Sequence, residues 1–155
     1  MPDVSILAID LAKHSFQVCA TTAEGLVIYN RKYTRGKLEQ LLTDQPACLV
    51  TMEACATSHH WGRFATTLGH NVKLIPPIYV KPFVKRGAKN DANDAAAIAT
   101  AVRQPSMRFV RIKSQEQQSH AMLFRSHQTF TRQRAQLLIT LRGHLAEHGI
   151  IVAKG

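Results

Sequence analysis

Short apolar runs of strand length dominate the first part of the chain. The first covers Val4–Ile9 and ends at a single acid, Asp10. Its β-branched residues favour a strand over a buried helix segment. A second run covers Phe16–Thr21, and a third covers Leu26–Tyr29 after a turn at Gly25. The short polar connections between the runs predict an antiparallel meander of three strands.

The pattern then alternates between helix and strand. Thr34 is a candidate N-cap for a helix through about residue 42, and Cys48–Met52 is the next apolar strand, which ends at Glu53. A second helix is predicted from residue 57 or 58 to residue 68, and a further short strand over Val72–Ile75. This order predicts an α/β fold whose mixed sheet starts antiparallel and is extended by parallel crossovers. Asp10 and Glu53 then lie side by side if the first and fourth strands pair.

The last part of the chain is helical in pattern. An alanine-rich stretch over residues 91–102 strongly favours helix, and one long helix is predicted from residue 113 to about residue 148. Its apolar residues Leu123, Phe130 and Leu137 recur at intervals of seven, which is typical of coiled-coil association. We therefore divide the chain into a domain over 1–112, a linking or dimerising helix over 113–149, and residues 150–155 as the start of a further C-terminal region.

Charge separates the two halves of the chain. Residues 1–75 hold 7 basic and 6 acidic residues, a net of +1, whereas residues 76–155 hold 13 basic and 4 acidic residues, a net of +9. An excess of this size on one half predicts a polyanionic partner, and nucleic acid is favoured over lipid because no helix combines a basic face with bulky aromatic anchors. The alternative is a basic surface that serves only solubility.

Basic residues in two places are the candidate nucleic-acid ligands. They are Lys81, Lys85, Arg86 and Lys89 before the alanine-rich helix, and Arg125 and Arg132 on the long helix. Tyr79 and Phe83 stand among the first group, and such interleaving suits nucleic acid whose bases can stack on aromatic rings. The alternative is a basic surface loop with both aromatic rings turned inward.

The cysteines and the hydropathy pattern predict a cytoplasmic protein. Cys19, Cys48 and Cys55 are odd in number and lack metal-binding spacing, so we expect them to be reduced and buried. No apolar run approaches the roughly 20 residues of a membrane span, and no signal peptide is recognisable. We expect no membrane association.

Four acids form the candidate active site. Asp10 and Glu53 end two predicted strands, and Asp91 and Asp94 fall on one face of the first turn of a helix. A cluster of carboxylates repels itself unless a cation intervenes, and hard oxygen ligands suit Mg²⁺ or Mn²⁺. Two such ions support in-line phosphoryl transfer. The alternatives are a turn aspartate at position 10 and two acids that only complement the helix dipole.

Three segments carry a family resemblance. AIDLAKHSFQV, MEACATSHHW and KNDANDAAAIA, in this order and spacing, closely resemble the amino-terminal domain of the DEDD transposases of bacterial insertion sequences, a family that includes Piv-type DNA invertases and bridge-RNA-guided recombinases. The resemblance implies a RuvC-like fold of the RNase H superfamily and metal-dependent DNA recombination. It implies that Asp10, Glu53, Asp91 and Asp94 are the metal ligands, that DNA and a guide RNA are candidate partners, and that the long helix contributes to a homodimer.

One departure and three alternatives stay open. The family carries a second domain with a serine nucleophile, and nothing in this sequence corresponds to it, so recombination by this chain alone is in doubt. A non-catalytic nucleic-acid-binding domain or an inactive transposase fragment is the main alternative. An actin-like kinase fold also opens with a strand ending in Asp, but no glycine follows Asp10 in the phosphate loop. Cys55, His59 and His60 suggest zinc less well than a helix face with a buried Cys.

Overall fold

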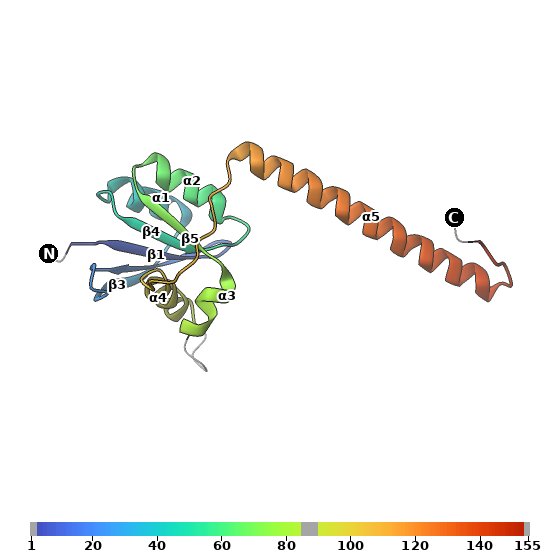
Figure 1. Cartoon of the computed structure of the whole chain (residues 1–155), viewed down its shortest axis with the longest axis horizontal. Coiled ribbons are helices and arrows are strands. Elements are labelled where there is room, and N and C mark those ends of the chain that lie inside the picture. Colours follow the sequence, from blue (N-terminus) through green and yellow to red (C-terminus); the bar gives the residue numbers. More distant parts are fainter. Residues whose placement is uncertain (1–2, 85–89, 154–155) are drawn as a thin grey trace. The chain divides into compact units, whose positions relative to one another are not determined.

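The computed structural model describes residues 3–84 and 90–153, and the chain forms two compact units, residues 1–112 and residues 113–155. The first unit holds one sheet with helices on its faces, and the second holds one long helix (Figure 1).

A five-stranded mixed sheet, with the strand order β3-β2-β1-β4-β5, forms the centre of the first unit. The strands are β1 (Ile6–Leu11), β2 (Phe16–Thr21), β3 (Val27–Tyr33), β4 (Leu49–Glu53) and β5 (Asn71–Ile75). The pairs β1–β2 and β2–β3 are antiparallel, whereas β1–β4 and β4–β5 are parallel. The predicted meander and its parallel extension are therefore confirmed, and the first and fourth strands do pair.

The helices begin and end at recognisable local signals. They are α1 (Arg35–Asp44), α2 (Ser58–Thr67), α3 (Pro77–Val80), the 3-10 helix η1 (Lys81–Phe83), α4 (Asp91–Ala101) and α5 (Gln115–Glu147). The Asn90 side chain caps α4 by accepting a hydrogen bond from the Asn93 N–H group at 2.8 Å. Thr34 and Thr57 occupy the N-cap positions of α1 and α2 without a side-chain capping bond. Gly69 ends α2 with a φ of +90°, which glycine adopts readily.

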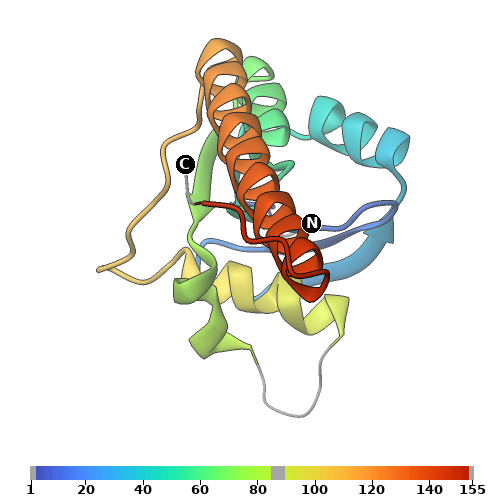
Figure 2. The same ribbon diagram turned by 90° about the vertical axis from the view of Figure 1, so that its right-hand side faces the viewer.

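Apolar side chains cover both faces of the sheet and form two cores. On one face, Leu7, Ile9 and Val18 pack with Leu38 of α1 and Trp61 of α2. On the other face, the buried residues of α4 pack against alternate residues of the same strands; the strand residues are Ile6, Ala8, Cys19 and Ile75. The sheet thus lies between two helical layers, with α1 and α2 on one side and α4 on the other (Figure 2).

Two strands differ from the sequence prediction by two residues or more at one end, whereas β4 and β5 differ by one residue. β1 begins two residues later than predicted and continues through Leu11, which pairs with Phe16. Asp10 therefore lies inside the strand and not after it. β3 continues beyond Tyr29 to Tyr33 through a polar stretch, because that stretch pairs with β2 along its whole length.

The second unit is the predicted long helix, α5. Ser114 and Gln117 form a reciprocal capping box, with the Gln117 N–H donating to Ser114 Oγ at 3.1 Å and the Ser114 N–H donating to Gln117 Oε1 at 3.0 Å. None of its residues is buried, and Leu123, Phe130 and Leu137 are each about 70% exposed. Among the described residues, no helix is long and apolar enough to cross a membrane.

The cysteine prediction is correct in part. All three thiols are free, Cys19 is buried and Cys48 is half-buried. Burial raises the pKa of the Cys48 thiol to about 11, so this group stays protonated near neutral pH. Cys55, however, is exposed, because it lies in the loop between β4 and α2 and not on the buried face of the helix. The prediction that it is buried is wrong.

Candidate functional site

Asp10 and Glu53 lie in one transverse row of the sheet. Asp10 pairs with Gln17 in the β1–β2 ladder, and Gln17 pairs with Lys32 in the β2–β3 ladder. On the other side, the last pair between β1 and β4 is Ile9–Met52, so Asp10 and Glu53 are the next residues along these neighbouring parallel strands. The row therefore carries Lys32, Gln17, Asp10 and Glu53 on four adjacent strands.

This row lies on the face of the sheet that α4 covers. Side chains alternate along a strand, and Asp10 has the same parity as Ile6 and Ala8, which pack against α4. Glu53 likewise has the parity of Leu49, which packs against the same core. The first turn of α4 holds Asp91 and Asp94. The fold thus brings all four predicted acids to one face.

The electrostatics of Asp10 reflect this arrangement. Its pKa is raised to about 6, mainly by partial burial and then by the negative charges of Asp94, Asp91 and Glu53, in that order. Burial and the charge of Asp94 also raise the pKa of Glu53. The carboxylates of Glu53, Asp91 and Asp94 are therefore near enough to Asp10 to disfavour its ionised form.

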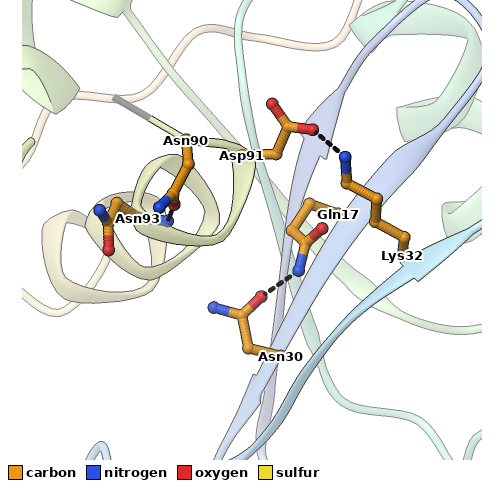
Figure 3. A network of polar contacts seen from close by, with 6 residues as sticks. All are labelled: Gln17, Asn30, Lys32, Asn90, Asp91 and Asn93. Atoms are coloured by element: carbon orange, nitrogen blue, oxygen red, sulfur yellow. Dashed lines mark hydrogen bonds and ion pairs between the residues drawn. The ribbon is translucent and has the colours of Figure 1, made fainter. Parts of the chain in front are cut away.

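Asp91 behaves differently from the other acids. Its Oδ2 atom lies 2.7 Å from Lys32 Nζ (Figure 3). The hydrogen bond and the positive charge of Lys32 hold the pKa of Asp91 below its usual range. Within the part of the chain that the structure describes, no three His, Cys, Asp or Glu side chains gather closely enough to hold a metal ion as they stand.

A pair of amides that sequence reasoning missed connects the sheet to the first turn of α4. Gln17 Nε2 donates to Asn30 Oδ1 at 2.7 Å, and Asn30 Nδ2 donates to the carbonyl oxygen of Ala92 at 2.8 Å. Gln17 is only 6% exposed, so its amide is committed to this network (Figure 3). The sequence alone gives no signal for this amide pair, because the contact depends on how β2 and β3 pair.

Two hollows flank these residues. One, of about 620 Å³, is lined by side chains of β2 and β3 and by the start of α4; its lining residues are Gln17, Asn30, Arg31, Lys32, Asn90, Asp91 and Ala92. The other, of about 470 Å³, borders Glu53 and is walled by Pro77, Ile78, Val80, Lys81 and Val84. The transverse row that runs from Lys32 to Glu53 therefore has open space at both ends.

The basic and aromatic candidates are placed only in part. Lys81 is exposed at the start of η1, and Arg125 and Arg132 are exposed on α5. Tyr79 is 39% exposed, whereas Phe83 is half-buried against the α4 core, so only one of the two rings is turned inward. The remaining candidates, Lys85, Arg86 and Lys89, lie outside the described residues.

The donor chemistry of the acid set fits a hard divalent cation. Four carboxylates supply oxygen ligands of the kind that Mg²⁺ and Mn²⁺ prefer. The repulsion that raises the pKa of Asp10 is also what such an ion would relieve. Asp10, Glu53 and Asp94 would hold the ion, and Asp91 would join them on leaving Lys32.

The segment that suggested zinc has other contacts. His60 Nε2 is 3.1 Å from Arg35 Nη2, and the Arg35 guanidinium stacks over the Trp61 ring with 5.1 Å to its centroid. Cys55 and its neighbours thus form no metal-binding group among the described residues. Through Arg35, His60 and Trp61, helices α1 and α2 contact each other on the face of the sheet opposite the acids.

Comparison with known proteins identifies the family. The model of the IS110-type DEDD transposases, described as "Transposase", matches residues 7–150. A probable family 20 transposase of Pseudomonas aeruginosa is 41% identical over 152 residues, which are 98% of this chain and 45% of that protein. The transposase for insertion sequence element IS1328 of Yersinia enterocolitica is 39% identical over 155 residues, all of this chain and 46% of that protein. The chain spans less than half the length of each relative.

A solved structure bears on the fold. The Thermus thermophilus RuvC structure superposes with a TM-score of 0.50 at 13% identity, over 68% of this chain and 99% of that one. At this identity the likeness concerns the fold alone, and it confirms the predicted RuvC-like architecture of a mixed sheet with flanking helices. Since the family model covers nearly all of the sequence, this chain belongs to the DEDD transposase family of the IS110 type.

Proposed function

We propose that this chain is the acid-bearing catalytic part of a DNA transposase, in which Asp10, Glu53, Asp91 and Asp94 hold Mg²⁺ or Mn²⁺ for phosphoryl transfer on DNA. The single observation that carries the proposal is the placement of Asp10 and Glu53 on the face of the sheet that α4 covers, where burial and the charges of Asp94, Asp91 and Glu53 raise the pKa of Asp10 to about 6. A buried strand has no structural need for such a group, and its cost in stability is typical of a functional site.

The protein's own residues have distinct parts in this proposal. Asp10 and Glu53 are fixed by the sheet, so they provide the rigid side of the ligand set. Asp91 and Asp94 are presented by the first turn of α4, which the Asn90 cap holds in helical form. The bound cation would supply activation of the attacking oxygen and stabilisation of the leaving oxygen.

The basic half of the chain is the proposed nucleic-acid surface. The net charge of +9 over residues 76–155 suits binding of the DNA backbone through Lys81, Lys85, Arg86, Lys89, Arg125 and Arg132. A guide RNA is a second candidate for the same surface. We further propose that residues 113–149 join two copies of the chain, that residues 1–112 are the catalytic domain, and that the protein acts in the cytoplasm.

A non-catalytic nucleic-acid-binding domain is the second candidate. The ion pair between Lys32 and Asp91 favours it, because an acid with a purely structural role would be neutralised by a lysine and not by a metal ion. Crystals soaked in Mn²⁺ discriminate between the two. Catalysis predicts anomalous density within ligand distance of Asp10, Glu53 and Asp94. Density found only at other surface acids, in crystals that take up Mn²⁺, would favour the binding domain.

A further inference from the structure

The contacts at the first turn of α4 fall into one fixed and one exchangeable part. The fixed part is the amide pair of Gln17 and Asn30, which holds the backbone of the turn at the Ala92 carbonyl. The exchangeable part is the ion pair of Lys32 with the Asp91 side chain, whose partners are 63% and 47% exposed. Both contacts to the turn come from β3, and they reach the adjacent residues Asp91 and Ala92.

The two parts differ in how firmly they hold. The Asn30 amide is held on both sides, by the nearly buried Gln17 and by the part-buried carbonyl of Ala92, so moving it leaves polar groups that water reaches poorly without partners. An exposed ion pair is weak, because water screens the charges and two long side chains lose freedom in forming it. The turn of α4 therefore keeps its place on the sheet when the side chain of Asp91 changes its partner.

We propose that Lys32 is a resident counter-ion of the acid site, which holds Asp91 until a divalent cation replaces it. The inference rests on the proposed metal-binding function and adds to it a residue that the four-acid pattern does not contain. Lys32 lies in the same transverse row of strands as Gln17, Asp10 and Glu53, on the face that carries the acids. Its ammonium group thus already pairs with one of the four carboxylates, that of Asp91.

This placement accounts for two observations together. Three acids act on Asp10 through their charges, yet no three acidic side chains among the described residues form a ready metal site. Asp91 is turned toward Lys32, and the amide pair keeps its backbone within reach of the other three. Exchange then requires only side-chain rotation at Asp91 and release of Lys32 toward the adjoining hollow of about 620 Å³.

Release of Lys32 has a consequence for ligand binding. The freed ammonium group lies beside the loaded site at the edge of an open hollow, where it can contact one phosphate. A divalent cation would therefore strengthen nucleic-acid binding by adding one phosphate contact. Lys32 is a positioning residue in this scheme, because it acts through Asp91 on the cation.

The test is the affinity of the whole chain for Mn²⁺ by titration calorimetry, for the parent and three variants. Lys32→Met removes the competing cation and is expected to bind Mn²⁺ about threefold to fivefold more tightly, the factor that a weak exposed ion pair represents. Lys32→Arg keeps a cation opposite Asp91 and is expected to stay within about twofold of the parent. Arg31→Met is the control for charge, because Arg31 is the adjacent residue but contacts the ring of Tyr29.

The outcomes separate this inference from the proposed function. If Lys32→Met and Arg31→Met change the affinity for Mn²⁺ equally, the proposed replacement of Lys32 by the cation is wrong, whereas the metal site itself is not contradicted. If the parent binds no Mn²⁺, both fail. The second readout is the salt dependence of binding to a short DNA duplex. Mn²⁺ is expected to steepen the log–log slope by about one in the parent and not in Lys32→Met. An equal change of slope in both proteins would exclude a phosphate contact by Lys32.

Discussion

A partly buried carboxylic acid near the end of a central strand affects the stability of the sheet. Asp10 is half-buried, pairs with Gln17 in the ladder, and has a pKa of about 6 in the folded protein against 3.8 in an unfolded chain. The folded state therefore takes up this proton more readily than the unfolded state. Above pH 6 the ionised carboxylate lowers the free energy of unfolding, and that cost disappears as the pH falls from 6 toward 4.

Asp10→Asn should remove this pH dependence. In chelator at pH 7.5 we expect the variant to be more stable than the parent by about 1 kcal/mol, because a shift of this size is reduced by solvent at a half-exposed site. At pH 4.5 the two should be nearly equal. Urea unfolding at both pH values measures the difference. Subtracting the free energy of unfolding of the parent from that of the variant cancels the contribution of the histidines, which both proteins share. A gap that does not narrow on acidification would refute the raised pKa.

The amide of Asn30 should contribute to stability through its two hydrogen bonds. Asn30→Ala leaves the nearly buried Gln17 amide without its acceptor, and we expect a loss of about 1–2 kcal/mol in the free energy of unfolding. Gln40→Ala, an exposed amide on α1, is the control and should change it by less than about 0.5 kcal/mol. Equal losses in urea titrations of the two variants would show that the connection to α4 is unimportant.

At the scale of elements, the hydrophobic pattern predicts most of the secondary structure. The apolar run over Phe16–Thr21 forms β2 as predicted, and α4 begins at Asp91 because Asn90 supplies the cap. The pattern fails where a strand is polar. β3 continues through Asn30, Arg31 and Lys32, which no hydrophobic period marks, because pairing with β2 and not burial determines its extent.

The same limit applies to the candidate site. The four acids are recognisable because each stands at the edge of an apolar run or in the first turn of an alanine-rich helix. Gln17 and Lys32 are not, because their importance depends on the register that places them in one row with Asp10. Register arises from pairing between strands that are distant in the sequence, and the hydrophobic pattern of one strand does not determine it.

The exposed apolar residues of α5 predict self-association. Leu123, Phe130 and Leu137 recur every seven residues and are about 70% exposed, a costly arrangement for an isolated chain. Leu137→Glu should shift the protein from dimer to monomer in sedimentation equilibrium, because a charge in the apolar seam is poorly tolerated. Gln128→Glu places the same charge at an exposed position on the opposite side of the helix and should leave the dimer intact. A parent that sediments as a monomer at high concentration would refute the prediction.

At the scale of the whole molecule, charge asymmetry predicts how nucleic acid is bound. The +9 half should make affinity fall steeply with salt, in proportion to the number of phosphates neutralised. Charge reversal at Lys85 and Arg86 should weaken DNA binding and lower the log–log salt slope by about two. The same reversal at Arg31 and Lys37, in the nearly neutral half, should have a smaller effect. Filter binding or anisotropy at several salt concentrations measures both, and equal effects would remove residues 85–86 from the interface.

A melting experiment on Asp94→Asn tests most directly whether the four acids form a cation site. Asp94 raises the pKa of both Asp10 and Glu53, so its neutralisation relieves repulsion that is unfavourable without a cation. In chelator at pH 7.5 we expect the variant to melt about 2–4 °C above the parent, equivalent to about 1 kcal/mol. Mn²⁺ should raise the melting temperature of the parent by mass action and should not stabilise the variant.

If Asp94 only complements the helix dipole, a different result is expected when parent and variant are each melted in chelator and in Mn²⁺. An acid that only complements the dipole of α4 contributes a few tenths of a kcal/mol, so its loss would lower the melting temperature slightly in chelator. If Asp94→Asn melts below the parent in chelator and Mn²⁺ shifts both proteins equally, the four carboxylates do not form a metal site. If the variant melts higher in chelator and only the parent responds to Mn²⁺, the account holds.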